Sequence, residues 1–404
     1  MSDYIIRPLH LITAGDIAVE ARTVLSTGDE EFRRRMRRFP RVLKVLAMNA
    51  KAQLPSSLAA LQLDHLPGAH GSAYVFSDDE ALLATADRVT STAAPLAEAL
   101  RVCLTNCERR TFDLPLRDRV LQLDRRTLIM GIINCTPDSF YDGGRFDHVD
   151  RALERGLQMA AEGVDIIDIG GESTRPRGVY GAGAEPVSAE EELRRIIPVI
   201  TALRRQTGTA ISIDTYKAVV AEAAIAAGAD LINDISGTTF DPQMATVAAK
   251  LKVPVVIMHL KGTPQNMQQS PQYENLMDEI FLWLHGQVQK AVRVGVASNR
   301  IIIDPGLGFG KRIEHNYEII RRLTELRALG CPILVGASRK AFTGKAGDLP
   351  PAERLLGTVA ATTLAAANGA HIVRVHDPRE VQRALQIADL IAGKTNLASS
   401  EELK

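Results

Sequence analysis

Polar side chains end a series of apolar runs in the second part of the chain. The runs are rich in isoleucine and valine, and each is followed by an amide, a carboxylate, a histidine or a basic residue. These end residues are Asn134, Asp168, Asp214, Asn233, His259, Asp304, Lys340, Arg374 and His376. One such residue alone would more often be a structural cap. Because the pattern recurs after all eight runs, we expect a single functional site that collects these side chains.

The residue types indicate what the site could bind. Asp214, Asn233, Asp304 and Lys340 supply carboxylate acceptors, an amide that both donates and accepts, and an ammonium group. A heteroaromatic ring with an amidine edge and a lactam oxygen would satisfy such a set, because buried polar groups need partners. Arg374 and His376, together with the hydroxyl of Thr174, could hold an anionic group such as phosphate.

The sequence contains no cluster of cysteine, histidine and aspartate suited to zinc. Asn134, beside an acidic loop, could instead give one oxygen to Mg²⁺ while phosphates and water supply the other ligands. The four cysteines form no C-x-x-C pair, which fits free thiols in a reducing compartment.

Two long loops follow the first two apolar runs. Residues 135–146 read CTPDSFYDGGRF, and the glycine-rich residues 171–188 read GESTRPRGVYGAGAEPVS. A loop of this length in a compact domain is usually a functional lid or an unstructured segment. The STRPR segment of the second loop places two arginines and a hydroxyl directly after a strand end. This favours a catalytic lid over a plain surface loop.

The apolar runs predict strands that are buried on both faces, because they do not alternate with polar residues. The runs span 128–134, 165–170, 209–214, 230–235, 254–259, 301–306, 332–338 and 371–376. Amphipathic segments of helical length lie between them, and Ser188 with Glu191 fits a helix capping box. Eight strand–helix units in about 275 residues predict a (β/α)₈ TIM barrel, with the strand ends at one mouth. An open doubly wound sheet is the main alternative, weakened because no G-x-G-x-x-G follows the first strand.

The chain before the barrel lacks the regular alternation of apolar runs and amphipathic segments. We expect a smaller α/β domain over residues 1–112 and the barrel over 113–404. RVLKVLAM resembles a strand, and residues 78–104 resemble a helix. TFDLPLRDRVLQL (111–123) predicts a short strand pair that closes the bottom of the barrel. A run of five arginines between residues 33 and 38 fits a solvated helix face better than a nucleic-acid site, because no aromatic residues interleave with it.

The overall composition excludes several classes of protein. The 404 residues include 48 lysines and arginines and 48 aspartates and glutamates, so no net field favours nucleic acid or an acidic membrane surface. The N-terminus has no apolar signal core, and no apolar stretch is long enough to span a bilayer. We expect a cytoplasmic protein.

Taken together, these motifs resemble those of the dihydropteroate synthases over about residues 128–380. The similar segments, each at a predicted strand end, are MGIINCTPDSFYDGG, DIGGESTRP, SIDTYK, NDISG, MHLKGTPQNMQ, DPGLGFGK, GASRK and RVHD. One short motif would be weak evidence of a relationship, whereas eight motifs in the same order are specific to the family. The resemblance implies condensation of 6-hydroxymethyl-7,8-dihydropterin diphosphate with p-aminobenzoate, with Mg²⁺ as cofactor and a homodimer as the assembly.

The resemblance also implies a role for each matching residue. Asp214, Asn233, Asp304 and Lys340 would bind the pterin, flanked by Ile235, Met258 and Arg374; Asn134, Thr174, Arg374 and His376 would hold the diphosphate, with Mg²⁺ on Asn134; Thr174, Arg175, Pro176, Phe309 and Lys340 would shape the p-aminobenzoate pocket; Phe140 and Asp142 would close over the reacting centre. The implied catalytic residues are Asp214, Asp142, Phe140, Arg175 and Lys340.

Two features depart from the family pattern. Many relatives carry serine where this chain has Ala341, although backbone N–H groups at that helix N-terminus could still bind the p-aminobenzoate carboxylate. The first 112 residues have no counterpart in the compact members, so the resemblance implies nothing about their role.

Two other functions remain as alternatives. A pterin-binding methyltransferase, which moves a methyl group from a methylated folate to a corrinoid, would share the pterin-site acids. It would not need STRP, the SRK segment or R-x-H, and this chain has all three. A barrel that binds pterin without catalysis would show decay at Asn134, Asp214, Lys340 or His376, and none is seen.

Overall fold

The chain folds into two compact units, which are described separately. The computed structural model describes residues 4–24, 28–39, 41–48, 54–87, 93–123, 125–136, 145–173 and 186–395. The first unit comprises Met1–Arg109 together with Arg321–Gly330, and the second comprises Arg110–Ile320 and Cys331–Lys404.

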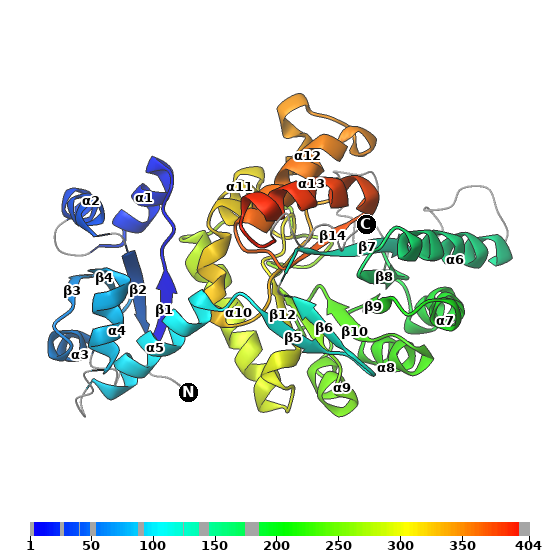
Figure 1. Ribbon diagram of the computed structural model, residues 1–404, viewed down its shortest axis with the longest axis horizontal. Coiled ribbons are helices and arrows are strands. Elements are labelled where there is room, and N and C mark those ends of the chain that lie inside the picture. Colours follow the sequence, from blue (N-terminus) through cyan, green and yellow to red (C-terminus); the bar gives the residue numbers. More distant parts are fainter. Residues whose placement is uncertain are drawn as a thin grey trace. The chain divides into compact units, whose positions relative to one another are not determined.

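The second unit is built on a parallel sheet of eight strands (Figure 1). They are β7 (Leu128–Asn134), β8 (Ile166–Gly170), β9 (Ala210–Asp214), β10 (Leu231–Asp234), β11 (Val255–Met258), β12 (Ile301–Asp304), β13 (Leu334–Val335) and β14 (Ile372–Val375). The order β12-β11-β10-β9-β8-β7-β14-β13 follows the chain around a circle. A parallel bridge between Ile303 and Ile333 joins the two end strands. This closure confirms the TIM barrel and excludes the open doubly wound sheet.

Helices follow the strands and form the outer layer of the barrel. They are α6 (Arg145–Ala161), α7 (Ala189–Gln206), α8 (Ala218–Ala227), α9 (Met244–Leu251), α10 (Leu276–Arg293), α11 (Ile313–Arg321), α12 (Leu355–Ala367) and α13 (Pro378–Ile391). Figure 1 shows α6 to α9 outside the strands β7 to β10. Ser188 is the N-cap of α7, where its side chain accepts a hydrogen bond from Glu191 N, as the sequence predicts.

A two-stranded hairpin seals the lower end of the barrel. β5 (Phe112–Pro115) pairs antiparallel with β6 (Val120–Leu123), which confirms the predicted strand pair. Phe112 and Leu114 pack into one apolar cluster with an interior residue from every barrel strand. Those strand residues are Leu128, Met130, Ile166, Ala210, Leu231, Val256, Ile302, Leu334 and Ile372. The lower part of the barrel is therefore solid core rather than a channel.

The first unit is a four-stranded antiparallel sheet with helices, in agreement with the smaller α/β domain predicted. Its strands β1 (Tyr4–Pro8), β2 (Arg41–Ala47), β3 (Asp64–Pro67) and β4 (Ser72–Ser77) have the order β1-β2-β4-β3. Its helices are α1 (Ala14–Ala21), α2 (Gly28–Arg38), α3 (Leu54–Ala60), α4 (Asp79–Asp87) and α5 (Ala94–Glu108). The segment expected to be one helix over 78–104 is thus divided between α4 and α5.

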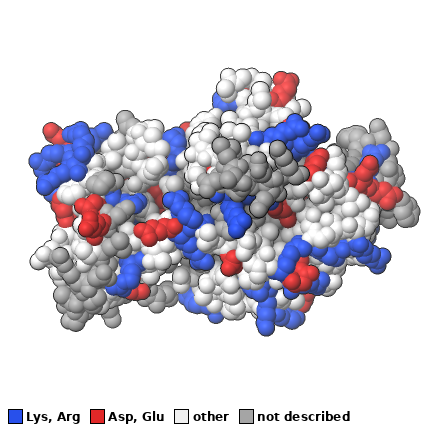
Figure 2. All heavy atoms as spheres, in the orientation of Figure 1, with Lys and Arg blue, Asp and Glu red and all other residues white. Residues whose placement is uncertain are grey.

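The arginine run lies on α2, as a helix face. Figure 2 shows lysine and arginine side chains gathered over this helix, while both signs are interspersed elsewhere on the same face. Glu31 forms ion pairs with Arg34 and Arg35, and the side chain of Arg34 is 72% exposed. These contacts fit the solvated face expected from the sequence.

A short piece of chain that follows α11 folds with the first unit. It contains the 3₁₀ helix η3 (Leu323–Leu329). Arg322 and Glu325 form a fully buried ion-pair network with Arg7 and Glu20 of the N-terminal region. The first unit is therefore discontinuous in sequence.

Candidate active site

The polar residues at the barrel mouth form a layer directly above the apolar core. Side chains two residues apart on a strand point to the same face. Stepping two residues on from the core residues of the strands leads to Asp168, Ser212, Asn233, Met258, Asp304, Gly336 and Arg374. Asp214 stands one further step along β9, opposite Gly170 of β8 and Asn233 of β10. The site is therefore positioned by the same alternation that builds the core.

Arg374 joins two strand-end carboxylates. Its Nε donates to Asp168 Oδ2 at 2.6 Å, and its Nη2 donates to Asp214 Oδ2 at 2.6 Å. Asn233 Nδ2 donates to the same Asp168 oxygen at 3.1 Å. Asp168 is fully buried, and its other oxygen has no hydrogen-bond partner among the described residues. Asp168 thus orients the guanidinium of Arg374 and the amide of Asn233 through one carboxylate oxygen. Its other oxygen remains able to accept a hydrogen bond.

The electrostatics of Asp214 are those of a carboxyl group poised to change charge. Burial raises its pKa to about 7, and the charge of Asp168 adds to this rise, while Arg374 opposes it. A Cβ placed on Gly170 would lie 3.4 Å from Asp214 Cβ, so the backbone of β8 passes close to this carboxylate. Strongly perturbed acids of this kind concentrate at functional sites.

Asp304 ends β12 and Lys340 precedes the 3₁₀ helix after β13, and both side chains are held by backbone groups. Asp304 Oδ1 accepts a hydrogen bond of 2.7 Å from Gly306 N, and Lys340 Nζ donates to the carbonyl of Leu307. Burial lowers the pKa of Lys340 to about 8, against the attraction of Asp304, and burial raises the pKa of Asp304. Lys340 Nζ also lies 4.5 Å from the centre of the Phe309 ring.

The backbone that presents Lys340 is strained. Arg339 has φ +55°, in the left-handed region that residues other than glycine rarely adopt. Its N–H donates to Thr358 Oγ1 at 2.9 Å, and its guanidinium pairs with Asp377. These contacts hold a conformation that costs about 1–3 kcal/mol, and such strain is typical of functional turns. The residue after Lys340 is Ala341, the start of the 3₁₀ helix η4 (Ala341–Gly347).

A second buried cation lies behind Asp304. Lys311 Nζ is 2.8 Å from His259 Nδ1 and 3.0 Å from the Phe309 carbonyl. Burial lowers the pKa values of Lys311 and His259 well below their usual ranges. Gly306, with φ +68°, permits the close pass here, because a Cβ on it would lie 2.0 Å from the His259 carbonyl oxygen.

The structure brings most of the predicted residues to one mouth. Asn233, Met258, Asp304 and Arg374 lie in the layer described above, and Asp214 stands one step beyond it. Ile235 is buried, and Phe309 packs against Lys340, which precedes η4. His376 follows β14, and its backbone N–H donates to Ser338 Oγ at 3.1 Å. Asn134 ends β7, the strand that pairs with β14.

Five predicted residues fall outside the described residues. They are Phe140 and Asp142 on the first loop and Thr174, Arg175 and Pro176 on the second. Their roles stay predictions.

The part of the chain that the structure describes offers few ligands for a metal. Within the described ranges, no group of three or more histidine, cysteine, aspartate or glutamate side chains is arranged to hold a metal ion. Asn134 is half-buried at the end of β7 and has an amide oxygen to offer. Such a donor fits a hard cation that takes most of its ligands from a bound phosphate and water, and it does not fit zinc.

Sequence reasoning gave no role to three residues that organise the site. The sequence predicts Asp168 at a strand end but does not connect it to Arg374, and it assigns no role to Ser338 or Lys311. Ser338 Oγ lies 2.9 Å from His376 Nδ1. A signal existed for Asp168, because it is a carboxylate inside an otherwise apolar buried strand, where a charge needs a partner.

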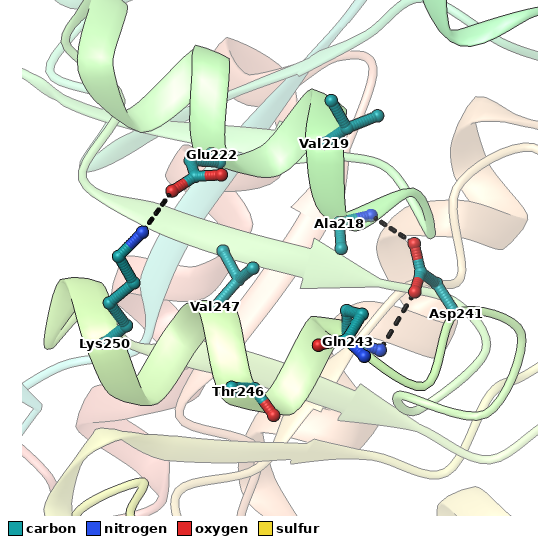
Figure 3. A pocket seen from close by; sticks show the side chains of 8 residues that line it. All are labelled: Ala218, Val219, Glu222, Asp241, Gln243, Thr246, Val247 and Lys250. Carbon is teal, nitrogen blue, oxygen red and sulfur yellow. Dashed lines mark hydrogen bonds and ion pairs between the residues drawn. The ribbon is translucent and has the colours of Figure 1, made fainter.

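A surface hollow lies away from the mouth. It has a volume of about 400 Å³ and lies between α8 and α9 on the outer layer (Figure 3). Its charged groups are used within the protein: Lys250 pairs with Glu222 at 2.8 Å, and Asp241 accepts hydrogen bonds from Ala218 N and Gln243 N. It contains none of the mouth residues, and we do not assign the chemistry to it.

Across the described part of the chain, no helix is both long and apolar enough to cross a membrane.

Comparison with known proteins defines the class to which this site belongs. Residues 130–376 match the family described as pterin binding enzyme. The dihydropteroate synthase of Synechocystis sp. is 47% identical over 279 residues, which are 69% of this chain and 94% of that protein. The corresponding Bacillus subtilis protein is 45% identical and covers 68% of this chain and 92% of its own length.

Solved structures agree. The Xanthomonas albilineans dihydropteroate synthase with 4-aminobenzoic acid is 42% identical, with a TM-score of 0.64, and covers 70% of this chain and 98% of that one. The Yersinia pestis dihydropteroate synthase in a sulfonamide complex is also 42% identical, with a TM-score of 0.65, and covers 70% and 100%. The chain belongs to the dihydropteroate synthase family.

Proposed function

We propose that this protein condenses 6-hydroxymethyl-7,8-dihydropterin diphosphate with p-aminobenzoate, releasing diphosphate and 7,8-dihydropteroate. The observation that carries the proposal is the set of polar residues at the barrel mouth, in a chain of this family. These residues are Asp214, Asn233, Asp304, Lys340 and Arg374. These residues supply hydrogen-bond acceptors, donors and charged groups, and other groups of the barrel fix their orientation.

The pterin ring is matched by the separated acids and amide of this set. Its amidine edge donates hydrogen bonds, and Asp304 and Asp214 are acceptors. Asn233 can both donate and accept, and Lys340 can donate to the lactam oxygen. Ile235 and Met258 give the apolar walls beside these groups. This arrangement supports assignment of the pterin to the floor of the mouth.

The reaction begins with loss of the leaving group. The bond between the pterin methylene carbon and the diphosphate oxygen breaks, and the electron pair leaves with diphosphate. Ionised Asp214 stabilises the pterin cation that remains, while Asn134, Thr174, Arg374 and His376 hold the diphosphate. Mg²⁺, bound through Asn134 and the diphosphate, would neutralise charge on the leaving group.

The amine of p-aminobenzoate then attacks the methylene carbon and loses a proton to give the product. Thr174, Arg175, Pro176, Phe309 and Lys340 are assigned to its pocket, with Phe140 and Asp142 closing over the centre. The contact of Phe309 with Lys340 supports the part of this assignment that falls on described residues. The N–H groups at the start of η4, after Ala341, are the proposed partners of the carboxylate.

The test is an assay of diphosphate release from the pterin diphosphate. Release should require p-aminobenzoate and should yield 7,8-dihydropteroate in equal amount. Asp304→Asn should weaken pterin binding about tenfold or more, because a charged acceptor is lost. The matched control Glu222→Gln, in the outer hollow, should bind as the wild type does. Pterin binding without release would favour the non-catalytic barrel, and methyl transfer without diphosphate release would favour the methyltransferase. The homodimer and the cytoplasmic location stay predictions from the sequence.

A further inference from the structure

A lysine outside the assigned site joins the two ends of the second loop. Lys217 Nζ forms an ion pair with Glu172, two residues after β8, and another with Glu192 Oε2 at 2.5 Å, in the first turn of α7. Glu172 and Glu192 are 20 residues apart, and the loop with Thr174 and Arg175 lies between them. The side chain of Lys217 is 18% exposed, and those of Glu172 and Glu192 are 9% and 1% exposed. The three groups form one largely dry cluster, which we call the loop clamp.

The start of the loop is also packed directly on α7. A Cβ placed on Gly171 would lie 2.9 Å from Glu192 Cγ and 2.9 Å from Ile196 Cγ2, so only glycine fits this approach. Arg195 Nη1 donates to the Gly171 carbonyl at 2.9 Å. The backbone at Gly171 is therefore held independently of the lysine, while the side chain of Glu172 turns toward it.

The lysine is itself rigidly mounted. Lys217 precedes α8, and its N–H donates to Thr215 Oγ1 at 3.2 Å, while Thr215 N donates to the Asn233 carbonyl of β10 at 3.1 Å. Tyr216 adds a hydrogen bond of 2.8 Å from its hydroxyl to Glu172 Oε1. The clamp thus extends from the framework of the barrel rather than from a free loop.

The clamp is continuous with the group that is proposed to act on the pterin. Asp214 lies three residues before Lys217, and Gly170, next to Gly171, lies against Asp214. One stretch of chain therefore carries the pterin carboxylate at one end and the loop anchor at the other. A shift of the loop relative to Asp214 would change the distance between the two substrates, and small misplacements have large effects on rate.

The charge of the cluster argues against a role in folding alone. Two carboxylates share one ammonium group, and Glu192 Oε1 has no hydrogen-bond partner among the described residues. Burial raises the pKa of Glu192, and Glu172 adds to the rise. An apolar contact would hold the loop base at lower cost in free energy, whereas this ion-pair geometry fixes direction as well as distance.

We propose that Lys217 is a positioning residue for p-aminobenzoate, which acts by fixing Glu172 against Glu192 at the base of the second loop. The proposal rests on the proposed function and deepens it. It gives Lys217 no contact with either substrate.

The main experiment compares Lys217→Met with Lys217→Arg in the full chain. Lys217→Met should raise the KM for p-aminobenzoate about tenfold or more. The Kd for the pterin diphosphate, measured by calorimetry, should rise at most about threefold, because Thr174 is only one of four residues assigned to the diphosphate. Lys217→Arg should restore most of the loss, because its guanidinium can also join two carboxylates. The matched control Lys250→Met removes an exposed lysine paired with Glu222 and should leave both constants unchanged. Equal losses for the two substrates, or no loss in Lys217→Met, would overturn the proposal.

A second variant guards against misfolding of Lys217→Met. Glu172→Gln keeps the Lys217–Glu192 pair and should reproduce a smaller, p-aminobenzoate-specific rise in KM of about threefold to tenfold. Hydrogen exchange of amides 171–173 and 189–195 should speed up in both variants relative to Lys250→Met. That measurement needs no turnover, so unchanged exchange would refute the clamp even if the wild type released no diphosphate. Loss of release in the wild type would refute the proposed function alone.

Discussion

The two units each contain a buried cluster of acidic and basic groups, and the clusters are built on opposite plans. In the first unit, Glu20 receives Arg7 Nη2 and Arg322 Nη2 on Oε1, each at 2.7 Å, and Lys44 Nζ on Oε2 at 3.2 Å. Glu325 likewise binds guanidinium groups on both oxygens. Every carboxylate oxygen is met by a cation.

In the barrel mouth the pairing of acids and cations is incomplete. Arg374 pairs with Asp168 and Asp214, but the two lysines and Asp304 are bound by other groups. Lys340 Nζ donates to a carbonyl, Lys311 Nζ lies against His259 and two carbonyls, and Asp304 accepts from a backbone N–H. Asp168 keeps one buried oxygen without a partner among the described residues. The barrel mouth therefore retains hydrogen-bonding groups that could bind a ligand, whereas the carboxylate oxygens of the cluster in the first unit are all paired with cations.

The pKa values follow the same division. Burial acts to raise the pKa of Glu20, but Arg7, Lys44 and Arg322 hold it well below its usual range. Burial raises the pKa of Asp214 to about 7 and lowers that of Lys340 to about 8. The first cluster stabilises charge in the folded state, and the second is kept near neutrality. A buried ionic cluster thus indicates a functional site when its charges are incompletely paired.

The largest effect should come from breaking the paired cluster. Glu20→Gln removes the carboxylate that three buried cations share, and we expect a loss of about 3–5 kcal/mol in unfolding free energy. Denaturant unfolding with fluorescence detection measures it. The control Glu31→Gln breaks a pair with the exposed Arg34 and should cost much less, because exposed ion pairs contribute little to stability. If the two variants unfolded alike, the network would have no special role in stability.

The loss in Glu20→Gln should depend on pH with a definite sign. The pKa of Glu20 is lowered by folding from about 4.5, so its stabilising effect is present above pH 4.5 and is lost as the pH falls below it. Wild type and variant should therefore converge in stability toward acid pH.

Asp214→Asn should give the second largest effect, in turnover rather than stability. The variant keeps the shape of the side chain but loses its charge, and one oriented electrostatic contact is worth about 10²–10³ in rate. Folding raises the pKa of Asp214 from 3.8 to about 7, so the carboxylate lowers stability as the pH rises through that window. At pH 8 the variant should unfold at the same temperature as the wild type or a higher one. A lower unfolding temperature with unchanged kcat would show that Asp214 contributes to stability rather than to turnover.

The pH profile should show both groups of the mouth. Asp214 acts ionised and Lys340 acts protonated, so kcat/KM for the pterin diphosphate should rise as the pH passes about 7 and fall above about 8. In Asp214→Asn the acid limb should vanish while the alkaline limb remains. Retention of the acid limb would assign that titration to another group.

Most of the barrel and much of its mouth could be predicted from the sequence, because both depend on local pattern. Apolar runs such as 128–134 and 301–306 lie within one or two residues of β7 and β12. A polar residue at the end of each run marks the mouth, since parallel strands in a barrel all end there. Asp214, Asn233, Asp304 and Arg374 were found in this way.

What could not be predicted depends on distant pairing and on backbone conformation. Asp168 and Arg374 are 206 residues apart, and no local spacing connects them. Arg339 adopts a left-handed backbone conformation, which in a sequence is usually signalled by glycine. Because the residue here is arginine, the sequence gives no sign of this conformation. Residues 322–330 directly follow a barrel helix in the sequence, so their place in the first unit follows only from their buried partners.

The smallest effect concerns the metal and separates the two halves of the pterin substrate. Asn134 offers a neutral amide oxygen at the end of β7, and Mg²⁺ would take its other ligands from diphosphate and water. Asn134→Ala should therefore weaken Mg²⁺-dependent binding of the pterin diphosphate about tenfold, while a pterin without diphosphate binds almost as before. Calorimetry with both ligands, with Mg²⁺ and with chelator, measures the difference. Chelator should weaken diphosphate binding in the wild type and have little further effect in the variant. An equal loss for both ligands would remove Asn134 from the diphosphate and place it with the pterin ring.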